Sequence, residues 1–171
     1  SLLRNGFELT VHNRSRGKVE EMIALGATGA SSPAEITRAT DIVLTCLPDV
    51  PTVEEVFLSA DGVVASARPG QILVDHSTVS PSTSREIARA AEARGVKFLD
   101  APVSGNASMA EAGTLTILVG GDKASHEMAV PVFQATGQTI LHLGPPGAGS
   151  AVKLAINSLI STNAAGAAEA F

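Results

Sequence analysis

Aromatic residues and cysteine are scarce in this 171-residue sequence, which has no tryptophan, no tyrosine and one cysteine. A lone cysteine excludes a disulfide framework and favours a reducing cytoplasm as the location of the protein. Cys46 lies within the apolar run 42–47, so we expect a small buried side chain there and not a catalytic thiol. The four histidines are widely separated and show no metal-ligand spacing, so we predict no metal site; they are His12, His76, His126 and His142.

Positive charge is also sparse, because 12 Lys and Arg residues stand against 17 Asp and Glu residues, for a formal net charge of −5. The basic residues form no cluster, and no Trp or Tyr is present to stack on bases. We therefore expect no nucleic-acid partner. No signal peptide or membrane-spanning run is visible, so we expect no membrane partner either. The 44 % of hydrophobic residues predict a folded domain with a buried core.

Strand and helix patterns alternate along the chain. We expect strands at 7–12, 41–47, 71–75, 96–99, 115–119 and 139–143, and helices at 16–25, 33–39, 53–58, 81–94 and 123–134. Strands separated by helices predict βαβ units, and therefore an α/β domain with a mostly parallel sheet. The continuous apolar run at 41–47 is typical of a strand that is buried on both faces.

Ligands of such sheets bind beyond the carboxyl ends of the strands. Asn13, Arg14 and Ser15 follow the first expected strand, where a fold that prefers NAD places an acidic residue. An arginine at this place favours NADP over NAD, because it can bind the 2′-phosphate; the alternative is a solvated loop arginine. Leu47 and Pro48 follow the apolar strand, where proline forces the chain to leave the sheet.

Two further strand ends carry hydroxyl groups. Thr78 follows the strand at 71–75 and either donates to a cofactor amide or only serves the turn. Ser104 and Gly105 follow the strand at 96–99 and form a compact, uncharged group of donors that suits a carboxylate. A plain Ser-Gly turn is the alternative interpretation of that pair.

Lys153 is the only charged side chain among residues 128–168, and Asn157 follows it by four positions. The segment from Ser150 onward has no proline and predicts a helix, on which positions i and i+4 share a face. This face either presents an ammonium and a carboxamide that donate a proton and orient an oxygen, or is only the polar stripe of an amphipathic helix.

Taken together, these runs resemble the β-hydroxyacid dehydrogenase family, which includes 3-hydroxyisobutyrate dehydrogenase and the tartronate and succinic semialdehyde reductases. The matching pieces occur in family order across nearly the whole chain. They are Asn13-Arg14-Ser15, Leu47-Pro48, Asp75-His76-Ser77-Thr78, Asp100-Ala101-Pro102-Val103-Ser104-Gly105, Gly113-Thr114-Leu115-Thr116-Ile117 with Val119-Gly120-Gly121, and Gly144-Pro145-Pro146-Gly147-Ala148-Gly149 followed by Lys153 and Asn157.

The resemblance implies reversible hydride transfer between NADP, or NAD, and a small 3-hydroxy acid or the corresponding semialdehyde. It implies that Lys153 is the catalytic acid and base, a role that needs burial and a cationic neighbour, and we expect the apolar helix to supply the burial. Asn157 would orient the substrate, and Ser104 with Gly105 would bind its carboxylate. The cofactor contacts would be Asn13, Arg14, Ser15, Leu47, Pro48 and Thr78, with Thr52 a weaker candidate.

The resemblance also implies a Rossmann-like dinucleotide-binding domain at 1–146, lacking its first strand and its Gly-x-Gly-x-x-Gly turn. Residues 147–171 would then begin an all-helical domain of a homodimer or homotetramer. Two glycines that often follow the Val-Ser-Gly run are replaced here by Asn106 and Met109, so the substrate stays open. The alternatives are a non-catalytic Rossmann-like fragment or binding module, and an imine reductase-like enzyme.

Overall fold

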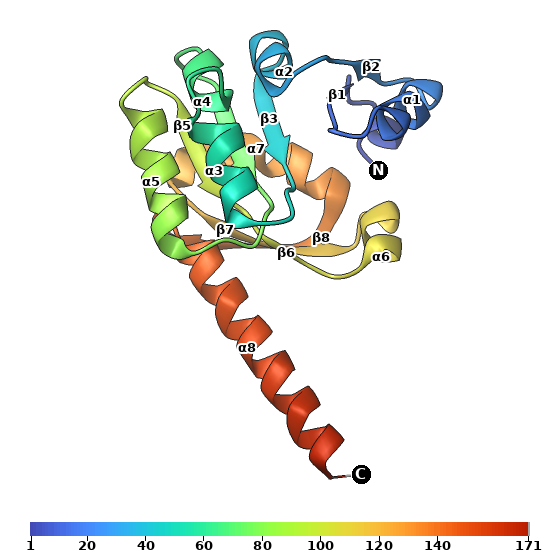
Figure 1. Cartoon of the computed structure of the whole chain (residues 1–171), viewed down its shortest axis with the longest axis vertical. Helices are drawn as coiled ribbons and strands as arrows, with labels where there is room; N and C mark the ends of the chain where they lie inside the picture. Colours follow the sequence, from blue (N-terminus) through green and yellow to red (C-terminus); the bar gives the residue numbers. More distant parts are fainter. Residues whose placement is uncertain (171) are drawn as a thin grey trace.

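The computed structural model describes residues 1–170 and shows an α/β domain from which one long helix projects (Figure 1). The main sheet has six strands in the order β3-β4-β5-β7-β6, with β8 also paired to β7. A separate parallel pair, β1 with β2, lies beside it. The strands are β1 (Thr10–Val11), β2 (Thr28–Gly29), β3 (Ile42–Thr45), β4 (Ile72–Asp75), β5 (Lys97–Asp100), β6 (Val103–Ser104), β7 (Leu115–Gly120) and β8 (Gly137–Gly144).

Three of the five strand pairings in the main sheet are parallel, as is the β1–β2 pair, which confirms the mostly parallel, Rossmann-like sheet. The exceptions are β5 and β6, which both run antiparallel to β7. Asp100 on β5 pairs with Gly120, and Ser104 on β6 pairs with Thr116. The segment 100–104 therefore follows one edge of β7 and extends beyond the carboxyl end of the parallel strands.

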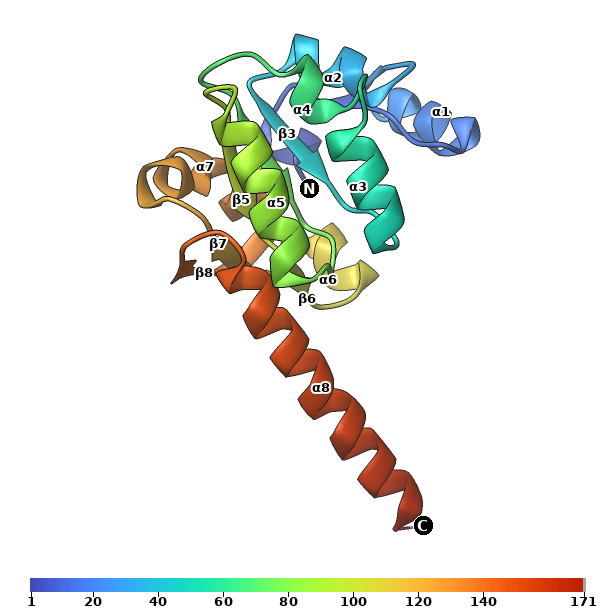
Figure 2. The same ribbon diagram turned by 60° about the vertical axis from the view of Figure 1, so that its left-hand side comes forward.

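Helices cover both faces of the main sheet (Figures 1 and 2). On one face α3, α4 and α5 enclose a core in which the rings of Phe57 and Phe98 meet edge to face with centroids 5.7 Å apart. On the other face α7 packs its Phe133 against residues of β4, β5 and β7. Burying each such side chain contributes about 1.5–3 kcal/mol, so the two cores hold the sheet rigid beneath its carboxyl edge. The helices are η1 (Leu3–Asn5, 3-10), α1 (Arg16–Ala24), α2 (Pro33–Ala39), α3 (Val50–Leu58), α4 (Val63–Ser66), α5 (Pro81–Glu92), α6 (Ala107–Ala112), α7 (Lys123–Thr136) and α8 (Ala148–Glu169).

Local capping chemistry sets where most of these helices begin. Ser32 and Ser80 accept from the backbone N–H three residues on, and a proline occupies the first turn of each helix. Asp49, Asn106 and Asp122 do the same for α3, α6 and α7. Because Asp49 caps its helix, α3 begins at Val50 and not at 53 as expected.

The expectation that the strand at 41–47 is buried on both faces is wrong. Only Val43 of β3 is buried, because β3 pairs with β4 alone and, within residues 1–170, its other edge carries no strand. Cys46, expected to be buried, is exposed beyond the end of this edge strand. The short elements β2, α4, β6 and α6 were not predicted, and the first strand is reduced to Thr10–Val11.

Helix α8 begins against the sheet and then leaves the body of the domain (Figures 1 and 2). From Ser158 to Glu169 all of its residues are exposed, including Leu159 and Ile160. None of the helices in the described part of the chain has both the length and the apolarity needed to cross a membrane.

Candidate functional site

The carboxyl ends of β4 and β5 carry a pair of buried aspartates. Asp75 and Asp100 are partners in the parallel register of these strands, and each is 1 % exposed. A buried carboxylate costs free energy unless hydrogen bonds satisfy it. Each of the two accepts such bonds from a different segment at the edge of the sheet. Both residues lie inside motifs of the family resemblance, but the sequence predicted no role for either.

Asp75 organises the loop that follows β3. Its Oδ1 accepts from the hydroxyl of Thr45 at 2.7 Å and from the hydroxyl and backbone N–H of Ser77 at 2.5 and 3.0 Å. The Ser77 oxygen in turn accepts from the backbone N–H of Leu47 at 2.8 Å. The turn after β4 and the loop after β3 are therefore joined. Next to these, the side chains of Pro48 and Thr78 are exposed at the edge of the sheet.

The loop after β1 belongs to the same region. Arg14 is exposed, and the amide of Asn13 donates to the carbonyl of Ser15 at 3.2 Å. Hydrogen bonds from Thr52 lower the pKa of Asp49, and the positive charge of Arg14 lowers it further. The Asn13–Ser15 loop and the Leu47–Asp49 loop thus approach each other, although their strands belong to different sheets.

Ser104 and Gly105 lie further out along the edge of β7. Ser104 lies four positions after Asp100, which is about 13 Å of extended chain. Gly105 has φ +145°, and a Cβ there would lie 2.7 Å from a methyl carbon of Leu115, so only glycine fits without movement. Asn106 follows as the N-cap of α6, where it accepts from the backbone N–H of Met109 at 3.0 Å.

Asp100 holds the beginning of α8. Its Oδ1 accepts from the backbone N–H of Gly147 at 2.7 Å and its Oδ2 from that of Ser150 at 2.8 Å. The hydroxyls of Ser150 and Ser84 are hydrogen-bonded at 2.9 Å, which ties α8 to α5. Burial raises the pKa of Asp100, and the hydrogen bonds from Gly147 and Ser150 oppose that rise. An aspartate that ends the apolar run 98–100 is the sequence signal that could have revealed this role.

Lys153 and Asn157 follow on α8, within one turn and two turns of Ser150. Both are half-buried, so the expectation that the apolar helix by itself buries Lys153 is met only in part. The reason is that α8 leaves the domain surface over this stretch. No hydrogen bond within residues 1–170 joins Lys153 to Ser104. Strand β7 connects the elements that carry Ser104 and Lys153, because it pairs with β6 at Ser104 and packs against α8.

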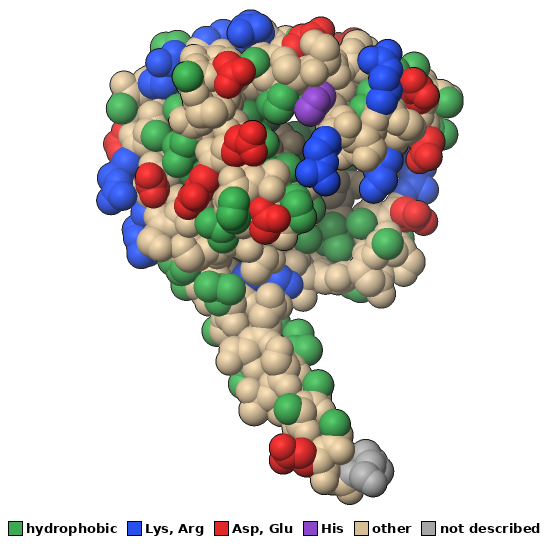
Figure 3. Space-filling model, viewed as in Figure 1, with side chains coloured by type: hydrophobic (Ala, Val, Ile, Leu, Met, Phe, Trp, Pro, Cys, Tyr) green, Lys and Arg blue, Asp and Glu red, His purple; other side chains and the backbone are tan. Residues whose placement is uncertain are grey.

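A cavity of about 430 Å³ opens between the N-terminal segment and α6 and appears in Figure 3 as a hollow. Its wall includes Gly105, Cys46 and His76. The Nδ1 of His76 lies 2.6 Å from the carbonyl oxygen of Ala101, so that nitrogen carries the proton. Desolvation lowers the pKa of His76. Desolvation and the nearby Asp75 raise the pKa of the Cys46 thiol, which disfavours a reactive thiolate.

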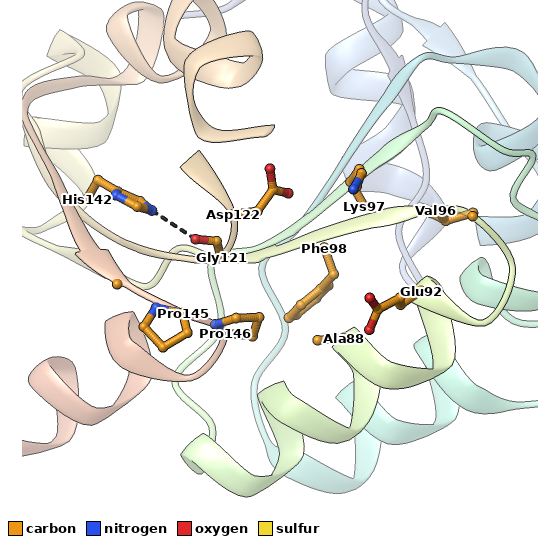
Figure 4. A pocket seen from close by; sticks show the side chains of 12 residues that line it. Ala88, Glu92, Val96, Lys97, Phe98, Gly121, Asp122, His142, Pro145 and Pro146 are labelled. Atoms are coloured by element: carbon orange, nitrogen blue, oxygen red, sulfur yellow. Dashed lines mark hydrogen bonds between the residues drawn. The ribbon is translucent and has the colours of Figure 1, made fainter. Parts of the chain in front are cut away.

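A second, larger cavity of about 660 Å³ lies near the amino end of β5 (Figure 4). Phe98, Pro145 and Pro146 line it together with Lys97 and Asp122, and the Nε2 of His142 lies 2.8 Å from the Gly121 carbonyl oxygen beside it. It contains none of the predicted site residues, so its size does not make it the functional site. Among residues 1–170 no three His, Cys, Asp or Glu side chains gather as metal ligands.

Residues 1–144 match the model of a protein family described as the NAD binding domain of 6-phosphogluconate dehydrogenase. Among curated proteins, an NAD-dependent L-serine dehydrogenase of Pseudomonas aeruginosa is 41 % identical over 170 residues, 99 % of this chain and 57 % of that protein. The chain thus spans little more than half the length of this relative.

Two solved structures share the fold and its long terminal helix. A 3-hydroxyisobutyrate dehydrogenase of Mycobacterium tuberculosis, studied with L-serine, superimposes with a TM-score of 0.93 at 34 % identity, over 99 % of this chain and 57 % of that one. A protein called Psf3, in complex with NADP⁺ and 2-OPP, also gives 0.93 at 31 % identity, over 98 % of this chain and 60 % of that one.

Proposed function

We propose that this chain, which belongs to the β-hydroxyacid dehydrogenase family, is the cofactor-binding part of an oxidoreductase that transfers a hydride between NAD(P) and a small 3-hydroxy acid or the corresponding semialdehyde. The observation that carries the proposal is the attachment of α8 to Asp100. It starts the helix that bears Lys153 and Asn157 at the same sheet edge as the loops of Leu47 and Thr78.

The residues at this edge fit a nicotinamide dinucleotide. The exposed Pro48 and Thr78 lie where the ligands of open α/β sheets bind. Arg14, exposed and without an acidic residue beside it in the loop, suits the 2′-phosphate of NADP, so we propose NADP over NAD. The 171 residues contain no Gly-x-Gly-x-x-Gly turn, so the pyrophosphate would need donors from elsewhere. When bound, the nicotinamide supplies or accepts the hydride.

The relatives indicate the chemical class of the substrate. The names of two of them refer to L-serine and to 3-hydroxyisobutyrate, both of which carry a carboxylate and a hydroxyl group. We propose that Ser104 and the backbone at Gly105 hold the carboxylate of such a substrate. A hydrogen bond to a charged group contributes about 1.5–3 kcal/mol, enough to orient a molecule of this size.

Lys153 would exchange a proton with the hydroxyl or carbonyl oxygen of the substrate, and Asn157 would hold that oxygen without competing for the proton. Since α8 buries Lys153 only in part, the remaining enclosure must come from the ligands or from chain outside residues 1–170. We also propose a domain boundary between residues 146 and 147, a homo-oligomeric protein, as a dimer or tetramer, and a cytoplasmic location.

Lys153→Ala in the full-length gene product tests the proposed role of Lys153 as acid and base. Positioned acid–base groups usually contribute about 10²- to 10⁴-fold, so we expect kcat to fall by at least 10²-fold with cofactor affinity unchanged. Lys123→Ala, which removes an exposed lysine on α7, is the matched control. A fall of less than about tenfold would refute the acid–base role and favour a non-catalytic binding module.

A further inference from the structure

Helix α8 has no N-cap side chain of its own. Its N-cap position is Gly147, which has φ +92° and no side chain to bond the first-turn N–H groups. The other capped helices of this domain use the Ser, Asp or Asn at the position itself. The cap of α8 instead comes from Asp100, which is 47 residues earlier in the chain.

The cap is bidentate and rigid. One carboxylate oxygen of Asp100 accepts from Gly147 and the other from Ser150, so both sides of the first turn are held. A negative charge at this place also suits the positive end of the helix dipole. Asp100 is 1 % exposed and fixed in β5, so the direction of α8 is set by a strand of the sheet and not by a flexible turn.

The same segment of chain leads from Asp100 to Ser104. Ser104 lies four residues after Asp100, along the edge of β7. Lys153 lies three residues after Ser150, less than one helical turn from the second hydrogen bond to Asp100. Asp100 therefore links the segment that carries Ser104, proposed to bind the carboxylate, to the first turn of the helix that carries Lys153, proposed to exchange the proton.

We propose that Asp100 is a positioning residue that fixes Lys153 relative to Ser104 by capping α8 from the end of β5. The proposal rests on the proposed function for the role of Lys153. It predicts a loss in kcat when the cap is removed, because a misplacement of about 1 Å costs up to about 10²-fold in rate. Cofactor affinity should not change, since the loops of Leu47 and Thr78 are held by Asp75 and Ser77 and not by Asp100.

The test compares Asp100→Asn with Ser77→Ala in the full-length gene product, using steady-state kinetics and amide hydrogen exchange. In Asp100→Asn one acceptor oxygen becomes an NH₂ donor that faces a backbone N–H. We expect faster exchange in residues 147–150, kcat about 10- to 100-fold lower and an unchanged Kd for NADPH. In Ser77→Ala we expect weaker NADPH binding, because Leu47 loses its acceptor, with exchange in α8 unchanged.

If Asp100→Asn does not fold, Ser150→Pro is the substitute. It deletes one N–H that Asp100 accepts, at a first-turn position where the helix itself does not use that N–H. Ser150→Ala is its control, since it loses the hydroxyl contacts with Ser84 and Asp100 but keeps the backbone N–H that Asp100 accepts.

Two outcomes would overturn the proposal. One is amide exchange in residues 147–150 at the wild-type rate in both Asp100→Asn and Ser150→Pro, and the other is a wild-type kcat in both of these variants. Hydrogen exchange does not depend on activity. A wild-type kcat in Lys153→Ala together with loosened α8 amides in Asp100→Asn would therefore refute the proposed function but not the capping contact.

Discussion

Gly149 contacts the backbone of Leu118 so closely that no side chain fits between them. A Cβ on Gly149 would overlap the Leu118 carbonyl oxygen and lie 2.8 Å from the carbonyl oxygen of Asp100. The first turn of α8 thus rests directly on β5 and β7. The position of α8 follows from steric contact there, in addition to the hydrogen bonds with Asp100.

Gly149→Ala should therefore destabilise the domain although alanine is the better helix former. We expect the free energy of unfolding to fall by about 1–3 kcal/mol, the usual cost of overpacking. Urea denaturation followed by circular dichroism measures it. Gly166→Ala on the same helix is the control, since nothing lies within 4 Å of its Cβ, and it should be neutral or stabilising by up to about 1 kcal/mol. Equal effects at both positions would contradict the close contact of α8 with the sheet.

Arg14→Ala should weaken the binding of NADPH more than that of NADH. A charged hydrogen bond to phosphate contributes about 1.5–3 kcal/mol, so we expect a loss of roughly 10- to 100-fold for NADPH and little for NADH. Fluorescence titration of the full-length gene product with each cofactor measures both values. Arg16→Ala, which removes an exposed arginine that pairs with Glu20, is the control. A similar loss for both cofactors would mean that Arg14 does not contact the 2′-phosphate.

Ser104→Ala should raise the KM for the hydroxy acid and leave the Kd for the cofactor unchanged. The expected rise is about tenfold or more, from the loss of one hydrogen bond to a carboxylate. Ser108→Ala is a matched control, because its hydroxyl bonds only to Asn106 within residues 1–170. A substrate analogue that lacks the carboxylate should bind Ser104→Ala and Ser108→Ala equally well. If Ser104→Ala still discriminates against that analogue as the wild type does, the carboxylate is held elsewhere.

His76 should make the domain less stable in mild acid. Desolvation lowers its pKa below the ordinary 6.5, so below that pH the unfolded chain binds a proton that the folded chain does not. The stability that the neutral His76 contributes to the folded domain is therefore complete above pH 6.5. It is lost as the pH falls toward the depressed pKa of His76 in the folded state. Unfolding free energies of wild type and His76→Asn, measured by urea denaturation between pH 5 and 8, should diverge across this interval. Asparagine keeps an N–H donor for Ala101 but does not titrate, so parallel curves would refute the assignment.

Much of the architecture was predictable because its signals are local. The apolar runs and the alternation of strand and helix patterns identified most elements, although often with displaced ends. The short elements β2, α4, β6 and α6 were missed because two to six residues show no measurable periodicity. The sequence predicted no role for three residues that organise the site, Thr45, Ser77 and Asp100. Each of them forms a hydrogen bond with a residue that is 30 to 50 positions away in the chain.

The sequence by itself determined the class of fold, the family resemblance and the residues that can carry the chemistry, among them Lys153 on a helix whose face it shares with Asn157. Those inferences depend on residue type and short spacing, which the chain displays directly. Only the tertiary structure decided that β3 is an edge strand, that Cys46 is exposed and that α8 buries Lys153 incompletely. It alone showed that α8 begins at the buried Asp100, because a hydrogen bond between β5 and a turn 47 residues later depends on how the sheet is assembled.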